Sequence, residues 1–146
     1  MTPVYQTNYG KDQGNCLTAC VASVLDIPIT SLPEFCVDNT WFTLLEKFCR
    51  ENGFTLTYWL HSASAPILCL GAYLIVILNL EGVDTFHCVI GKAVLESVTP
   101  DPVSATKLGV SDADRWGWKI ELVHDPNERG YPPIKSVFGY ILIGKQ

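Results

Sequence analysis

In the stretch Gln13-Gly14-Asn15-Cys16-Leu17-Thr18-Ala19-Cys20, a cysteine stands in the first turn of a predicted helix. The N-terminus of a helix carries unsatisfied N–H groups and roughly half a positive charge. That field favours a thiolate over a thiol and lowers the pKa of a cysteine. Cys16 is therefore a candidate nucleophile, in addition to being a small residue suited to a core.

The residues that follow Cys16 repeat with the period of an amphipathic helix. Asn15 is predicted to cap the start of this helix, and Pro28 to end it. Cys20 lies one turn after Cys16 on the same face and is interpreted as a core residue. The apolar face consists of Leu17, Cys20, Val21, Val24 and Leu25.

A second helix and then a series of strands are predicted further along the chain. Residues 29–34 indicate a short helical turn, and Asn39 or Thr40 caps a helix that ends at Gly53. Residues 73–80 are almost continuously apolar, which is typical of a strand covered on both faces. Helices first and strands afterwards indicate an α+β fold. Strands are predicted over residues 54–60, 73–80, 86–90, 119–124 and 136–143.

The length and composition favour one compact domain over residues 1–146. The chain has 146 residues, of which 48% are hydrophobic and 17% charged, with a net charge of -5. These values are typical of a globular domain that buries a substantial core. The acidic balance argues against a nucleic acid or an anionic membrane as the main partner.

The N-terminus and the cysteines bear on the compartment. The first residues lack the basic start and apolar run of an export signal. The most apolar run, residues 65–80, contains Pro66, Gly71 and Asn79, so we interpret it as a buried strand and not as a membrane span. Without an export signal, six cysteines are expected to be free thiols in a reducing compartment, the cytoplasm.

A nucleophilic cysteine needs a base, and the chain has three histidines. His87 lies inside a predicted strand, which is a rigid platform for a catalytic group. His61 lies in a loop rich in serine and alanine and is expected to be exposed. His124 ends a strand and is expected to be a surface or supporting residue. His87 is thus the predicted base.

The third member of a triad holds the imidazole in the correct orientation. Two aspartates share one local pattern, Asp101-Pro102 and Asp125-Pro126, and the clearer strand before Asp125 favours the second. An oxyanion hole also needs donors near Cys16. The N–H of Cys16 is one donor, and side-chain amides are available from Gln6, Gln13 and Asn15.

A zinc site is the alternative use of these residues. Cys16 and Cys20 with His87 or His124 supply suitable ligands, but no matching second pair follows. We therefore expect no metal and no cofactor.

Four strings of the sequence together resemble a known family. In order, they are Val4-Tyr5-Gln6-Thr7, then Gly14-Asn15-Cys16-Leu17-Thr18-Ala19-Cys20, then His87-Cys88-Val89-Ile90-Gly91-Lys92, then Val123-His124-Asp125-Pro126. They resemble the small papain-like, C39-peptidase-like cysteine hydrolases of bacteria and phages. The resemblance implies N-terminal helices packed on an antiparallel sheet, with Cys16 as nucleophile, His87 as base and Asp125 as orienting acid.

The chain departs from that family in two places. The connection from His87 to Asp125 is longer than a simple hairpin, which keeps Asp101 as an alternative third member. The glutamine is not at the usual short distance before the cysteine, which keeps Gln13 as an alternative to Gln6 for the oxyanion. Residues 92–118 are interpreted as a lid or an insertion, where a substrate or partner protein binds.

The expected function is that of a cysteine hydrolase of the peptidase or amidase type, acting through an acyl-enzyme on a peptide, isopeptide or protein. A transglutaminase-like acyltransferase uses the same residues with an amine as acceptor. A third hypothesis is an inhibitor or binding protein on the same scaffold without turnover. Under this third hypothesis, the partner is a host or defence protein. If a phage encodes the chain, the expected compartment is the host cytoplasm.

Overall fold

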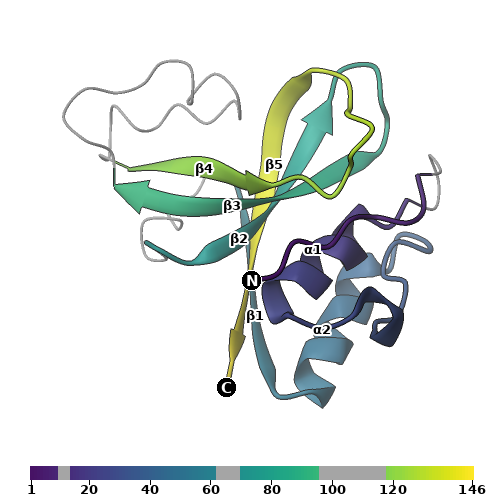
Figure 1. Ribbon diagram of the computed structural model, residues 1–146, viewed down its shortest axis with the longest axis vertical. Helices are drawn as coiled ribbons and strands as arrows, with labels where there is room; N and C mark the ends of the chain where they lie inside the picture. Colours follow the sequence, from purple (N-terminus) through teal and green to yellow (C-terminus); the bar gives the residue numbers. More distant parts are fainter. Residues whose placement is uncertain (10–13, 62–69, 96–117) are drawn as a thin grey trace.

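The computed structural model describes residues 1–9, 14–61, 70–95 and 118–146 of the chain. In these ranges two α-helices and one short 3-10 helix precede five strands (Figure 1). Neither α-helix in the described ranges is long and apolar enough to cross a membrane. In chain order the elements are α1 (Cys16–Leu25), η1 (Ile29–Ser31), α2 (Trp41–Glu51), β1 (Phe54–Leu60), β2 (Tyr73–Leu80), β3 (Phe86–Leu95), β4 (Trp118–His124) and β5 (Ile134–Lys145).

The strands form one antiparallel sheet in the order β1-β5-β2-β3-β4. Both α-helices lie on the same side of this sheet (Figure 1). The predicted α+β arrangement, with helices first and strands afterwards, is confirmed. The last strand of the sequence, β5, lies between β1 and β2, so β1 is joined to the rest of the sheet only through β5.

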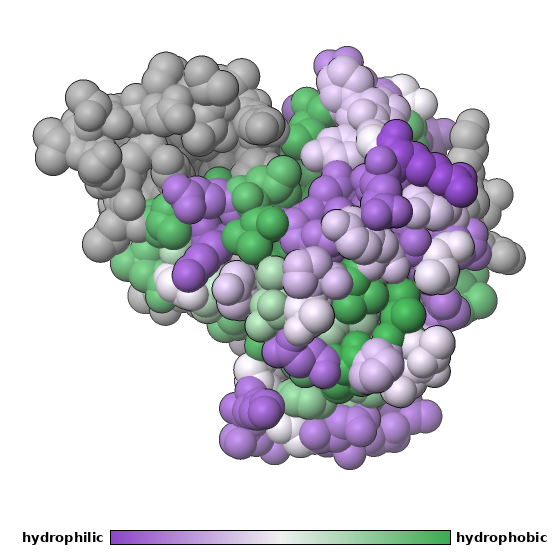
Figure 2. Space-filling model, viewed as in Figure 1, coloured by the Kyte–Doolittle hydropathy of each residue, from purple (hydrophilic) through white to green (hydrophobic). Residues whose placement is uncertain are grey.

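Strand β2 crosses the middle of the sheet and is buried on both faces, as its continuous apolar run predicts. Ile75 and Ile77 belong to the core shared with α1 and α2. The alternate residues Leu74, Val76 and Leu78 belong to a second core on the opposite face. Hydrophobic residues also lie over β3 and β4 in Figure 2, and on β4 the side chains of Leu122 and Val123 are 38% and 41% exposed.

Strand β3 is longer than predicted, and the reason is the role of one glycine. We expected the strand to end at Gly91-Lys92, but it continues to Leu95. Gly91 pairs with Leu74 of β2 and with Leu122 of β4, so it lies inside the sheet. A Cβ at this position would lie 2.4 Å from Cγ2 of Ile120. The glycine is therefore required by close packing and not by a turn.

The start of α1 also differs from the prediction. Asn15 occupies the N-cap position, but its side chain makes no hydrogen bond to the helix. Its Oδ1 accepts hydrogen bonds from the N–H groups of Thr7 and Asn8, each at 3.0 Å. Asn15 therefore fastens the N-terminal segment to the helix that begins with Cys16. The helix ends at Leu25, before Pro28, because Asp26 adopts a left-handed conformation with φ 55°.

Several predictions fall outside the described residues. Asp101, Gln13 and residues 96–117 of the predicted lid belong to this group. The first part of that predicted segment, residues 92–95, is the end of strand β3: all four residues pair with β4, and Lys92 also pairs with Tyr73 of β2.

Candidate active site

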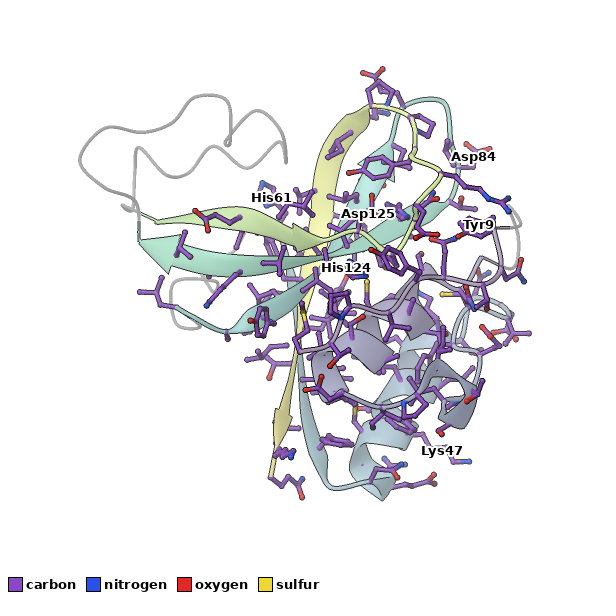
Figure 3. The ribbon with its side chains drawn as sticks, viewed as in Figure 1. Tyr9, Lys47, His61, Asp84, His124 and Asp125 are labelled. Carbon is purple, nitrogen blue, oxygen red and sulfur yellow. The ribbon has the colours of Figure 1, made fainter. Side chains whose placement is uncertain are left out.

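The fold brings Cys16, His87 and Asp125 together from three different elements. Cys16 is the first residue of α1, which packs on β3, and His87 lies on β3. Asp125 directly follows β4, and antiparallel pairing places the end of β4 near the start of β3. The Nε2 atom of His87 lies 2.9 Å from Oδ1 of Asp125. Figure 3 shows Asp125 between the end of β4 and the start of α1.

Asp125 and His87 are each held by further contacts. The N–H of Asn127 donates to the same Oδ1 of Asp125 at 2.8 Å, which fixes the carboxylate against rotation. The ring of Tyr131 packs beside the imidazole with 4.6 Å between ring centroids. His87 is 6% exposed, so its imidazole can turn only within a narrow range. Because Nε2 faces Asp125, the other ring nitrogen is left for the thiol of Cys16.

The surroundings of Cys16 and His87 favour a thiolate and an imidazolium. Hydrogen bonding from Cys88, together with the His87 imidazole, holds the pKa of the Cys16 thiol well below its usual range despite burial. Burial disfavours a charged imidazole, but Asp125 and Cys16 outweigh this effect and raise the pKa of His87 to about 9. The two shifts run in opposite directions, and both favour transfer of the proton from the sulfur of Cys16 to the imidazole of His87.

Cys88 is the site residue that sequence analysis missed. It is buried, and its thiol is the largest influence that lowers the pKa of the Cys16 thiol, with a smaller contribution from its backbone N–H. Its own pKa is raised well above the usual range by its interaction with Cys16 and by burial, so it remains a neutral donor beside the thiolate. Neighbouring residues of a strand point to opposite faces, which gave no reason to expect both His87 and Cys88 at one sulfur. The available signal in the sequence was that Cys88 directly follows His87, the predicted base.

Replacing Cys88 by alanine is expected to raise the apparent pKa of Cys16, because the thiolate loses a hydrogen-bond donor. Cys88→Ser keeps a donor at the same place and should keep the low pKa. The measurement is the pH dependence of Cys16 alkylation by iodoacetamide in both variants. If the apparent pKa of Cys16 rises equally in both variants, the cause is the void left at position 88 or a shifted strand, and not the lost hydrogen-bond donor.

Gln6 is brought to the site by contacts that the sequence did not suggest. Its N–H donates to the carbonyl of Pro126 at 3.0 Å, directly after Asp125. Its side chain is buried, and Nε2 donates to the carbonyl of Asn8 at 3.0 Å. An amide nitrogen has two hydrogens, so one N–H remains for a substrate oxygen. Among the described residues, Oε1 of Gln6 has no hydrogen-bond partner.

The two other histidines support the structure away from the reacting atoms. His124 is buried, not on the surface: its Nε2 lies 2.9 Å from the carbonyl of Val4, and its ring meets Tyr5 edge-on. It thus anchors the segment that carries Gln6, which agrees with a supporting role. His61 is half-buried, and its Nδ1 lies 2.8 Å from the hydroxyl of Tyr140, so the expectation of an exposed residue was wrong.

The other cysteine of α1 fits the core interpretation. Cys20 is completely buried in the cluster between the helices and the sheet. Burial raises the pKa of its thiol well above the usual range, so it stays protonated. Within the described residues, no group of three or more His, Cys, Asp and Glu side chains is arranged to hold a metal ion.

Cys16 and His87 line a cleft of about 510 Å³ together with Gln6. One wall comes from the helical part of the chain and includes Trp41. The opposite wall comes from β2, β3 and the turn between them and includes Ile77 and Phe86. The cleft is therefore mainly apolar, with the reactive sulfur and imidazole among its lining groups.

No protein-family model, curated protein or solved structure matches this chain. Its function is therefore inferred from the side chains of the cleft.

Proposed function

We propose that this protein is a papain-like thiol hydrolase that cleaves an amide or a related carbonyl compound through an acyl-enzyme. The observation that carries the proposal is that Cys16 and His87 line one cleft, while Oδ1 of Asp125 lies 2.9 Å from Nε2 of His87. A nucleophile, its base and an orienting acceptor are the parts that covalent catalysis by a thiol requires.

Acylation begins with the thiolate of Cys16. Its sulfur attacks the substrate carbonyl carbon, an S–C bond forms, and the carbonyl oxygen becomes an oxyanion. The N–H of Cys16 and the remaining N–H of Gln6 stabilise this charge. The imidazolium of His87 then gives its proton to the leaving amine as the C–N bond breaks. The result is a thioester on Cys16 and a free amine.

Deacylation returns the enzyme to its starting state. The neutral imidazole of His87 takes a proton from water while the oxygen attacks the thioester carbon. The S–C bond breaks, the acid is released, and Cys16 leaves as a thiolate beside the reformed imidazolium. Asp125 holds the ring in line for both steps and stabilises its positive charge.

The pH dependence of alkylation tests the thiolate–imidazolium pair without a known substrate. In the wild type, Cys16 should react rapidly with iodoacetamide well below pH 8.5, the ordinary range of a thiol. In His87→Ala the cationic partner is lost, so the apparent pKa of Cys16 should rise toward that range. Mass spectrometry of the alkylated peptides measures the rate at each cysteine separately.

Cys36 is the matched control, because it lines the same cleft. Burial raises the pKa of its thiol to about 12, so it should react slowly in both proteins. A Cys16 that reacts no faster than Cys36 would refute the proposed hydrolase. A fast Cys16 that is unchanged in His87→Ala would remove His87 from the mechanism.

A further inference from the structure

The cleft around Cys16 has carboxylates on both walls. Asp38 lies on the loop before α2, and Asp84 lies on the turn between β2 and β3. Both side chains are exposed, and among the described residues neither forms a salt bridge. Figure 3 shows Asp84 on the same side of the molecule as Tyr9 and Asp125. The two negative charges therefore face whatever enters the cleft.

No lysine or arginine is among the described residues that line this cleft, and His87 supplies its positive charge. Hydrogen bonds from the hydroxyl and the N–H of Thr40 lower the pKa of Asp38, so this carboxylate stays ionised in weak acid. Arg129 lies outside the lining, with its guanidinium 3.9 Å from the ring centroid of Tyr9. The two carboxylates leave the lining with an excess of negative charge, and such a cleft concentrates ligands of the opposite sign.

Two further features of the cleft indicate which ligand it suits. The apolar side chains of Trp41, Ile77 and Phe86 line the cleft and suit a hydrophobic group. Gln6 lines it as well, is only 7% exposed, and carries a side-chain oxygen without a hydrogen-bond donor among the described residues. A buried acceptor without a partner costs free energy, and an N–H group of a bound substrate removes that cost.

We propose that the cleft selects substrates with a positive charge next to an apolar side chain, as in a peptide with lysine or arginine beside a hydrophobic residue. Asp38 and Asp84 set the preference for charge, and the apolar lining sets the preference for the neighbour. This inference rests on the proposed hydrolase, since it names the substrate class of the same site.

Cys16 itself reports on the charge preference. Two methanethiosulfonates that differ only in charge, with a trimethylammonioethyl or a sulfonatoethyl group, are allowed to react with the protein at low salt. The thiolate attacks the reagent sulfur, a mixed disulfide forms, and methanesulfinate leaves. The ratio of the cationic to the anionic rate at Cys16 should fall severalfold in Asp38→Asn and again in Asp84→Asn, because each replacement removes one negative charge from the lining of the cleft.

Glu46→Gln is the matched control. Glu46 is exposed on α2, is not a lining residue, and its replacement changes the net charge by the same amount. Its rate ratio should equal that of the wild type. An equal fall in Glu46→Gln, or no fall in the double aspartate variant, would overturn the preference while leaving the thiolate intact. No reaction at Cys16 with either reagent would instead refute the hydrolase and the preference with it.

Cleavage of a mixed peptide library gives the second test. Products that require Cys16, identified by comparison with Cys16→Ala, should be enriched in lysine or arginine beside an apolar residue near the cut. The double variant Asp38→Asn, Asp84→Asn should lose the enrichment in basic residues and keep that in apolar ones. Cysteine-dependent cleavage next to acidic residues would overturn the proposal.

Discussion

Replacing Asp125 by alanine is expected to lower kcat/KM by about 10⁴-fold, the size of the loss seen when the orienting acid of a triad is replaced. The structure gives the physical reason: Oδ1 of Asp125 is held by Asn127 and accepts from His87 Nε2 at 2.9 Å. Without that acceptor the imidazole is free to turn away from the sulfur. Hydrolysis of a substrate from the library, measured against wild type, gives the ratio directly.

Asp125→Asn separates orientation from charge. The amide oxygen of asparagine still accepts a hydrogen bond, and an imidazolium donates from both nitrogens, so the ring should stay in place. Most of the activity should therefore remain. The lost negative charge, however, removes part of what raises the pKa of His87 to about 9. Because the protonated ring must supply the leaving amine, the alkaline limb of kcat/KM should move from about pH 9 to lower pH.

Asp101 provides the comparison that decides between the two aspartates. Asp101→Ala should leave both kcat/KM and the alkaline limb unchanged if Asp125 is the orienting residue. Loss of activity in Asp101→Ala, with normal activity in Asp125→Ala, would reverse the assignment and show that the contact between His87 and Asp125 is structural.

The parts of the fold that depend on local pattern were predictable. The apolar run of β2 and the alternation of β1 gave the bounds of both strands, because each run is closed by turn residues. Strand β3 was cut short because glycine usually indicates a turn, whereas Gly91 lies where β2 and β4 leave no room for a Cβ. Such close packing depends on Ile120, which comes from another strand, and no local pattern contains it.

The candidate site likewise has parts that local sequence predicts and parts that depend on tertiary contacts. The position of Cys16 at a helix start and of His87 on a strand follows from local sequence. The nearness of Asp125 depends on the pairing of β3 with β4, which sequence spacing left open between two aspartates. The influence of Cys88 on Cys16 joins two elements that are far apart in the chain, and Asn15 anchors a loop that lies outside its own helix. A polar side chain whose hydrogen-bond partner lies outside its own helix or strand leaves no periodic pattern in the sequence.

Replacing Gln6 by alanine is expected to lower kcat by about 10²- to 10³-fold with little change in KM, as for loss of one oxyanion donor. The N–H of Gln6 that is not bonded to Asn8 is free for an oxyanion. This charge exists only in the tetrahedral intermediate and the transition states that flank it, so binding of the ground state should hardly change. Alkylation of Cys16 by iodoacetamide forms no oxyanion at a carbonyl and should therefore keep its rate in Gln6→Ala.

Gln13→Ala is the matched variant, since both glutamines precede Cys16 and both were candidates for the oxyanion. If Gln6 is the donor, Gln13→Ala should hydrolyse substrate at the wild-type rate. A fall in kcat in Gln13→Ala alone would assign the oxyanion to Gln13 and leave Gln6 a structural role. A fall in both kcat and alkylation in Gln6→Ala would mean that the segment anchored by Asn15 and His124 has moved. The kinetic effect would then report a displaced thiolate and not a missing donor.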